Sequence, residues 1–354
     1  MTSAVARRRG AGAWRVPITA AIVLVVAYLI IFAGVVSQAH LSQNLTTADA
    51  LSQAQAQFIN AVTIGAIYAL IALGYTMVYG IIELINFAHG EIFMCGSFVS
   101  WWLLTSLGLS GAINDPLLLV GVLILSFVVS MLVMGVVGVV IERLAYRPLR
   151  NAPRLAPLIT AIGVSFILQN IVFVAISNSI VTIPQIIPNT VLTFGPLTIN
   201  LINLFVIILA VALMVALQLF IGRTRLGRAM RSTAIDRDAA QLMGVDINTT
   251  IALTFFIGSA LAGAAGVVQG LYFGITVFNI GFQAGLKAFT AAVLGGIGNT
   301  TGAALGGFVI GFLEVISSVW GQGRWSEAVV FGMLVLVLVF RPTGILGQQL
   351  GDRA

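Results

Sequence analysis

The stretch 82-IELINFAHGEIFMCG-96 places two carboxylates, a carboxamide and an imidazole within a strongly apolar part of the chain. The polar side chains are those of Glu83, Asn86, His89 and Glu91. Of the 354 residues, 59% are hydrophobic and only 8% are charged, which is typical of a membrane protein and not of a soluble domain. Ionisable groups are costly in hydrocarbon, so this cluster calls for a structural or functional reason.

Apolar runs long enough to cross about 30 Å of hydrocarbon recur along the chain. They predict an all-α, polytopic membrane bundle with about nine full spans and one short, glycine-broken segment near 283–297. The 38 glycines suit helices that pack closely in lipid. The full spans are expected at 17–36, 58–80, 90–108, 117–141, 156–178, 200–221, 251–272, 302–320 and 325–340.

The arginines predict the orientation, because Lys and Arg gather in cytoplasmic loops. They precede the first span, fill the loops at 143–154 and 223–237, and follow the last span. Both termini are therefore expected in the cytoplasm, provided that 283–297 also crosses the membrane. This clustering, at a net charge of +6, does not indicate a nucleic-acid surface. The segments expected outside, which lack Lys and Arg, are 37–57, 179–199 and 273–282.

The first apolar run also has the basic start of a signal peptide. Its apolar core is long, and Val36-Ser37-Gln38-Ala39 is a poor cleavage site, so retention of 17–36 is favoured. In both cases the chain from Ser37 begins outside.

Two interpretations of the opening stretch remain open. It could be a wet loop on the cytoplasmic side, where polar groups cost little. It could instead be a broken helix lining a solute path, because irregular backbone at membrane depth must be buried in protein or face water. The absence of Lys and Arg and the continuing apolar residues favour the broken helix.

A second irregular region, 285–307, contains Gly295, Gly296 and Gly298 within a short apolar run. Gly302 with Gly306, and Gly307 with Gly311, have the small-xxx-small spacing that indicates close helix packing. One interrupted segment in each half of the chain is typical of an internally duplicated transporter. A weak echo between 86–99 and 294–309 supports the duplication.

Lys287, the single lysine, is either a snorkelling interface residue or a partner for Glu314, which lies within a predicted span. The single cysteine, Cys95, excludes an intrachain disulfide and a multi-cysteine zinc site.

The long loop at 223–250 is expected to contain a short helix. Asp236 is a good N-cap for 237-RDAAQLM-243, and Gly244 is placed to end that helix. Its small residues, Ala239 and Ala240, could face a partner, although a solvated helix without a partner fits the same pattern. The chain has no GxxxxGK[ST] phosphate loop, so any ATP-driven step would belong to another chain.

Several segments together resemble the LivH-type permease subunit of bacterial branched-chain amino acid ABC transporters. The likeness covers about residues 58–347 in order, and urea and short-chain amide permeases share similar motifs. The chain departs from the family in its long N-terminal part and at Glu83, where a glycine or small residue is expected. The segments are 60-NAVTIGAIYALIALGYTMVYGIIELINFAHGEIFMCGSF-98, 142-ERLAYRPLR-150, 160-TAIGVSFILQN-170, 224-TRLGRAMRSTAIDRDAAQLMGVD-246, 286-LKAFTAAVLGGIGNTTGA-303 and 340-FRPTGILG-347.

The resemblance implies a permease domain at 58–347, preceded by an added span and outside segment at 1–57 and followed by a cytoplasmic tail at 348–354. It implies a bacterial inner-membrane importer with two ATPase subunits, an extracytoplasmic binding protein and a second permease subunit, for which a related, different chain is favoured over a second copy of this one. This chain would bind no cofactor or metal and carry no catalytic residue, with ATP held by the partners.

The resemblance also implies where the functional residues lie. Candidates for the translocation path are Asn86, His89, Glu91, Lys287, Gly295, Gly296 and Gly298. Candidates for the ATPase-coupling loop are Arg228, Arg231, Asp236, Arg237, Asp238, Ala239 and Gly244, with 232–246 as the coupling helix.

Two rival functions were weighed against an ABC permease. The carboxylate–imidazole cluster could relay protons in a secondary transporter, but such a carrier does not need the predicted loop helix. An intramembrane enzyme using His89 and Glu91 is disfavoured because the chain has only 2 histidines, too few for a usual metal site.

Overall fold

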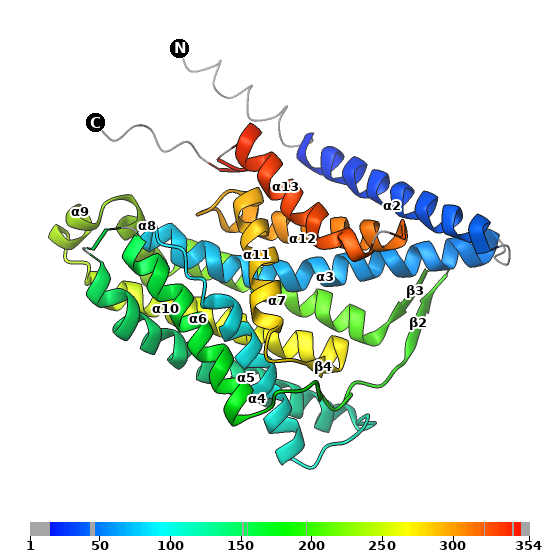
Figure 1. Cartoon of the computed structure of the whole chain (residues 1–354), viewed down its shortest axis with the longest axis horizontal. Coiled ribbons are helices and arrows are strands. Elements are labelled where there is room, and N and C mark those ends of the chain that lie inside the picture. Colours follow the sequence, from blue (N-terminus) through cyan, green and yellow to red (C-terminus); the bar gives the residue numbers. More distant parts are fainter. Residues whose placement is uncertain are drawn as a thin grey trace.

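The computed structural model describes residues 15–42, 47–150, 152–153, 155–195, 197–321, 323–341 and 343–347. This part of the chain forms the predicted all-α membrane bundle (Figure 1). Its long helices are α2 (Arg15–Ser42), α3 (Thr47–Ile82), α4 (His89–Ser106), α5 (Pro116–Ile141), α6 (Leu155–Ala175), α7 (Leu201–Arg223), α10 (Ile247–Phe273), α11 (Ile280–Gly295), α12 (Thr300–Val319) and α13 (Ser326–Phe340).

Among the described residues, 7 helical segments are long and apolar enough to cross a membrane: those of α3, α5, α6, α7, α10, α12 and α13. Shorter apolar stretches occur in α2 and α11. The helix α4 covers the span expected at 90–108, but its polar first turn keeps it outside that set.

The helices α3 and α10 form the centre of the bundle. In their most apolar windows, 89% of α3 and 78% of α10 is buried, against 17% for α6 and α7 and 11% for α13. A helix that is apolar all round and exposed on most of its surface faces lipid or another membrane subunit. The helices α6, α7 and α13 therefore lie at the surface of the bundle.

The packing has the pattern of an inverted repeat. The helices α3 and α10 run in opposite directions, as Figure 1 shows, and α3 packs on α12 as α10 packs on α5. Each is followed by an irregular segment and a shorter helix, and these shorter helices, α4 and α11, pack against each other. The repeat thus pairs α4 with α11 and α5 with α12. The sequence echo between 86–99 and 294–309 had matched α4 with α12, which this packing does not follow.

Small residues allow these helices to approach closely. A Cβ built on Gly311 of α12 would lie 2.5 Å from the Gly65 Cα of α3. On the other side of the repeat, a Cβ on Gly96 of α4 would lie 2.7 Å from the Gly263 Cα of α10. The small-xxx-small spacing is thus confirmed as a packing signal.

The two ends of the bundle differ in structure. One end carries α8 (Arg225–Ile235), α9 (Arg237–Leu242), the π-helical turn η1 (Glu142–Tyr146) and the 3₁₀ turn η2 (Arg147–Leu149), and we call it the arginine-rich end. The opposite end carries the antiparallel pair β1 (Val181–Thr182) with β4 (Ile275–Thr276) and the hairpin β2 (Val191–Phe194) with β3 (Leu197–Asn200). The short turn η3 (Gly323–Trp325) precedes α13.

The N-terminal helix lies outside the repeat. The helix α2 packs on α3 and α12 through a small separate cluster that includes Ile31, Val35 and Val315. Because α3 is continuous from Thr47, the boundary expected between 57 and 58 falls inside a helix. Most of the segment 37–57, expected as an outside loop, is therefore helical.

Lys287 and Glu314 form the ion pair that the sequence left open. Lys287 Nζ lies 2.9 Å from Glu314 Oε1, and the Tyr68 hydroxyl donates to Glu314 Oε2 at 2.7 Å. The pair joins α11 to α12, and the tyrosine joins both to α3. Lys287 therefore packs inside the bundle instead of snorkelling to an interface.

Removing one member of this pair should destabilise the bundle more than removing both. Lys287→Met or Glu314→Gln alone leaves a partly buried charge or polar group without its partner, which costs about 3 kcal/mol. The double variant Lys287→Met/Glu314→Gln should recover most of that loss. Thermal unfolding in detergent measures all three, and a double variant no more stable than either single variant would contradict the pairing.

Candidate functional site

The polar stretch that follows α3 is a true helix break, at residues 83–88. It begins at Glu83, which has a left-handed backbone with a φ of +56°. Among the residues that the structure describes, Glu83 is the one non-glycine residue with a positive φ. That conformation strains residues with a Cβ and favours glycine, in agreement with the small residue expected here. Glu83 is exposed, whereas Asn86 is buried, so the segment enters the bundle as it proceeds.

Asn86 holds the break together. Its Oδ1 accepts hydrogen bonds from the Ala88 amide at 3.1 Å and from the Tyr146 hydroxyl at 3.1 Å. The same hydroxyl lies 3.2 Å from the Ile85 carbonyl oxygen, so its one proton is shared between two acceptors. Tyr146 belongs to η1, so a turn at the end of α5 fixes the middle of the break.

His89 and Glu91 lie in the first turn of α4 and are fully enclosed by protein, with 0% and 1% exposure. The His89 ring packs edge-on against Tyr75 at 4.6 Å between centroids, and neither ring nitrogen has a side-chain hydrogen-bond partner among the described residues. The Ser165 hydroxyl donates to Glu91 Oε1 at 3.2 Å, and Oε2 has no such partner. This burial contradicts the wet-loop interpretation for Asn86, His89 and Glu91 and shows a helix break whose inner part is enclosed in protein, while a solute path along it stays a prediction.

The site is closed in this structure. A cavity of about 10 Å³ adjoins Asn86, which is room for about one water. It is lined by Tyr75, Tyr79, Ile85, Asn86, Phe289, Ala292 and Ile297. Because Ile297 belongs to the irregular residues 296–299 between α11 and α12, the two interrupted segments meet at this point.

Three glycines at the end of α11 and in the second break, which is the irregular segment 296–299, make different contacts. Gly298 lies beside the first break, since a Cβ built on Gly80 would be 3.3 Å from its Cα. Gly295 packs against Gly302 within the α11–α12 hairpin, and Gly296, with φ +105°, packs against Gly347. The structure thus brings Gly298 next to Gly80 near the end of α3 and leaves Gly295, Gly296 and Lys287 in other contacts.

The predicted loop helix is present as α9. The Asp236 carboxylate accepts a hydrogen bond from the Ala239 amide at 3.0 Å, and Gly244 follows the helix at φ +84°. Asp238 and Ala239 are exposed, but Ala240 is buried against the neighbouring elements. Ala240 therefore packs inside the chain and is not the partner-facing residue that the sequence suggested.

Arg228 and Arg231 attach α8 to the end of α7. Arg231 donates to the Ile221 carbonyl oxygen, and Arg228 to that of Arg223 at 3.5 Å. Such arginines satisfy carbonyls that a helix end leaves without partners. The sequence missed α8 as a separate helix, and also missed the exposure of Leu242 and Met243, at 88% and 85%. Leu242 and Met243 stand at the end of a short capped helix, and this position is the signal that could have indicated their exposure.

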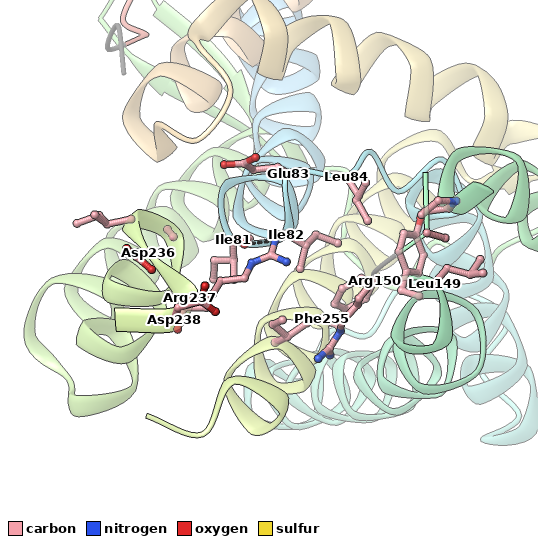
Figure 2. Close-up of a pocket in the computed structure, with 17 residues that line it drawn as sticks. Ile81, Ile82, Glu83, Leu84, Leu149, Arg150, Asp236, Arg237, Asp238 and Phe255 are labelled. Carbon is pink, nitrogen blue, oxygen red and sulfur yellow. Dashed lines mark hydrogen bonds between the residues drawn. The ribbon is translucent and has the colours of Figure 1, made fainter. Parts of the chain in front are cut away.

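Arg237 joins α9 to the end of α3. Its Nη2 donates to the Ile81 carbonyl oxygen at 3.1 Å, and both residues line a cavity of about 450 Å³ (Figure 2). This cavity, the α9 cavity, lies between α9, the first break, η1, η2 and α10. It is lined by Ile81, Ile82, Glu83, Leu84, Tyr146, Leu149, Arg150, Ala152, Pro157, Thr233, Ala234, Ile235, Asp236, Arg237, Asp238, Ile251 and Phe255.

Two further polar contacts anchor the far wall of this cavity. Arg150 pairs with Glu142 and donates to Asn248 Oδ1 at 2.7 Å, which ties η2 to η1 and to the start of α10. Asp246 caps α10, and hydrogen bonds from the hydroxyl and amide of Thr249 lower the pKa of its carboxyl. The described residues contain no group of three His, Cys, Asp or Glu placed to hold a metal.

The sequence of the chain matches known transport proteins. The model of the family described as "Branched-chain amino acid transport system / permease component" matches residues 57–338. The chain is 46% identical to the high-affinity branched-chain amino acid transport system permease protein BraD of Pseudomonas aeruginosa and 45% identical to LivH of Escherichia coli. Both likenesses cover 82% of this chain and 95% of the relative.

A more distant relative, the probable branched-chain amino acid transport permease protein LivH of Methanocaldococcus jannaschii, is 30% identical over 78% of this chain and 88% of its own length. No solved structure matches the chain. The family model and these relatives together show that the chain belongs to the permease components of branched-chain amino acid transport systems.

Proposed function

We propose that this chain is the membrane permease subunit of an importer that carries branched-chain amino acids inward, driven by ATP hydrolysis on separate ATPase subunits. The observation that supports an ATP-driven mechanism most directly is α9. It is a capped helix outside the membrane-spanning helices, and its exposed Leu242 and Met243 form an apolar tip. Apolar side chains gathered at a water-facing helix end favour a protein partner.

The remaining partners follow from the family. Two ATPase subunits would sit at the arginine-rich end, which is the cytoplasmic end by the positive-inside rule. A second, related permease subunit would pack in the membrane, and an extracytoplasmic binding protein would deliver the amino acid at the opposite end. Both chain termini would then be cytoplasmic, in a bacterial inner membrane.

The path would involve Asn86, His89 and Glu91 near the two breaks. A branched-chain amino acid has an ammonium, a carboxylate and an apolar side chain, and these residues offer a carboxylate, an imidazole and an amide with unpartnered polar atoms. They are enclosed within this subunit's own bundle, so a path that they line must open by separation of α4 and α11. The closed geometry is then one state of an alternating-access cycle.

Uptake of labelled leucine tests the function and its substrate. Cells lacking the chain should lose uptake, and restoring the chain should recover it. Excess unlabelled valine should compete, and excess urea should not. Competition by urea would favour a urea or amide permease instead. Uptake that persists after ATP depletion with the proton gradient intact would favour a proton-coupled carrier.

Replacing the apolar tip of α9 should weaken ATPase binding. The double variant Leu242→Ser/Met243→Ser removes two exposed apolar side chains from the proposed interface, and buried interface anchors typically carry enough binding energy for a loss of roughly tenfold or more. Pull-down of the ATPase subunit from detergent-solubilised membranes measures it. The matched control is Ile180→Ser, at a position 65% exposed at the opposite end. Equal ATPase recovery with the double variant and the wild type would contradict docking on α9.

The role of His89 can be separated from its packing. His89→Phe keeps a ring against Tyr75 and removes both nitrogens, and because the larger ring presses on Gly74 it should cost about 1–3 kcal/mol of stability while the protein still folds. If the imidazole contacts the cargo, leucine uptake should fall at least tenfold. His89→Ala is the comparison, because the lost ring should cost about 2–4 kcal/mol of stability. Normal uptake by His89→Phe would show that the ring serves packing alone.

A further inference from the structure

The C-terminal end of α3 lacks helical partners for its last carbonyls, as every helix end does. One of these, the Ile81 carbonyl, accepts its hydrogen bond from a different element, the Arg237 guanidinium at the start of α9. The bond is charge-assisted, and it falls two residues before Glu83, where the backbone turns left-handed. The strained start of the break is therefore held by a side chain of the loop that is proposed to dock the ATPase.

The other side of the same break is held from a fixed point. The Tyr146 hydroxyl contacts the Ile85 carbonyl and the Asn86 side chain. Its turn is anchored to α10 through Arg150, which bonds both Glu142 and Asn248. Residues 81–86 are thus attached to α9 at one end and to the α5–α10 pair at the other.

The α9 cavity separates these two attachments. The helix α9 rests on α8 and on α10, and Arg237 and Ile81 meet at the wall of the α9 cavity, where Figure 2 shows the Arg237 side chain beside Ile81 and Ile82. The carboxylates of Glu83, Asp236 and Asp238 line the same cavity. A shift of α9 can therefore change the Ile81 contact without first displacing a packed core.

We propose that Arg237 is a coupling latch, a positioning residue that transmits movement of α9 to the break between α3 and α4. This inference rests on the proposed function. While the latch is closed, the guanidinium keeps the end of α3 in place and Asn86, His89 and Glu91 stay enclosed. When a partner displaces α9, the Ile81 carbonyl loses its donor and the strained turn at Glu83 relaxes. The first turn of α4 is then free to move away from α11.

The latch makes a prediction that simple docking does not. Arg237→Ala should leave the amount of co-purified ATPase unchanged and lower the number of leucine molecules transported per ATP hydrolysed. The full complex, reconstituted in liposomes with the binding protein, allows both to be measured together. Because a charge-assisted hydrogen bond is lost, we expect the ratio to fall about tenfold. Arg237→Lys, whose ammonium can still donate to Ile81, should restore part of the ratio.

The matched control is Arg225→Ala, which removes an exposed arginine from the same loop and should keep the wild-type ratio. A wild-type ratio in Arg237→Ala would overturn the latch. So would a loss of co-purified ATPase at an unchanged ratio, because Arg237 would then be a docking residue. If the wild-type complex takes up no leucine, the proposed function is wrong, and the latch is wrong with it. If the wild-type complex takes up leucine and Arg237→Ala keeps the wild-type ratio, only the latch is wrong.

Discussion

Backbone amides and carbonyls that are freed where a helix is interrupted inside a bundle must find their hydrogen bonds elsewhere, and this constraint governs the structure around residues 83–88. A helix can be interrupted there only because other elements supply what the helix no longer does. Tyr146 and the Asn86 side chain satisfy the interior of the break, and Arg237 satisfies its outer edge. The burial of α3 and α10 in the centre of the bundle encloses the inner part of the break at Asn86 and Ala88, whereas its start at Glu83 stays exposed beside the α9 cavity.

The glycine-rich contacts of the inverted repeat serve the same end. Close approach of α4 to α11, where a Cβ on Gly285 would lie 2.9 Å from the Gly90 Cα, helps to enclose His89 and Glu91 in protein. The polar groups are consequently enclosed but incompletely partnered, which is costly in a static protein. In a transporter the same polar groups can bind solute in another state, and that binding offsets the free-energy cost of burying them without partners. Such a bistable element needs a mechanical input, and the hydrogen bond from Arg237 of α9 to Ile81 of α3 is one that the geometry offers.

Much of this architecture follows from sequence pattern, because span length, arginine clustering, the Asp236 cap and the glycine spacing are local signals. Contacts between distant segments leave no such signal. The bond from Arg237 to Ile81, the burial of Ala240 and the pairing of α4 with α11 depend on how separate helices meet. The polar residues at the start of α3 are typical of a linker, so the sequence predicts a loop there, but Ala50 and Ala54 of these turns pack in the cluster that α2 and α12 form with α3. Glu83 was recognised as unusual by resemblance, and its φ of +56° supplies the physical reason.

The central claim is that the break between α3 and α4 is closed in this state and opens during transport. Hydrogen exchange of the backbone amides at 83–91, followed by mass spectrometry on the wild-type complex, tests it directly. The account predicts slow exchange without nucleotide and markedly faster exchange during ATP turnover, while the amides of α10 stay protected in both conditions. Equal exchange at 83–91 in the two conditions would contradict it.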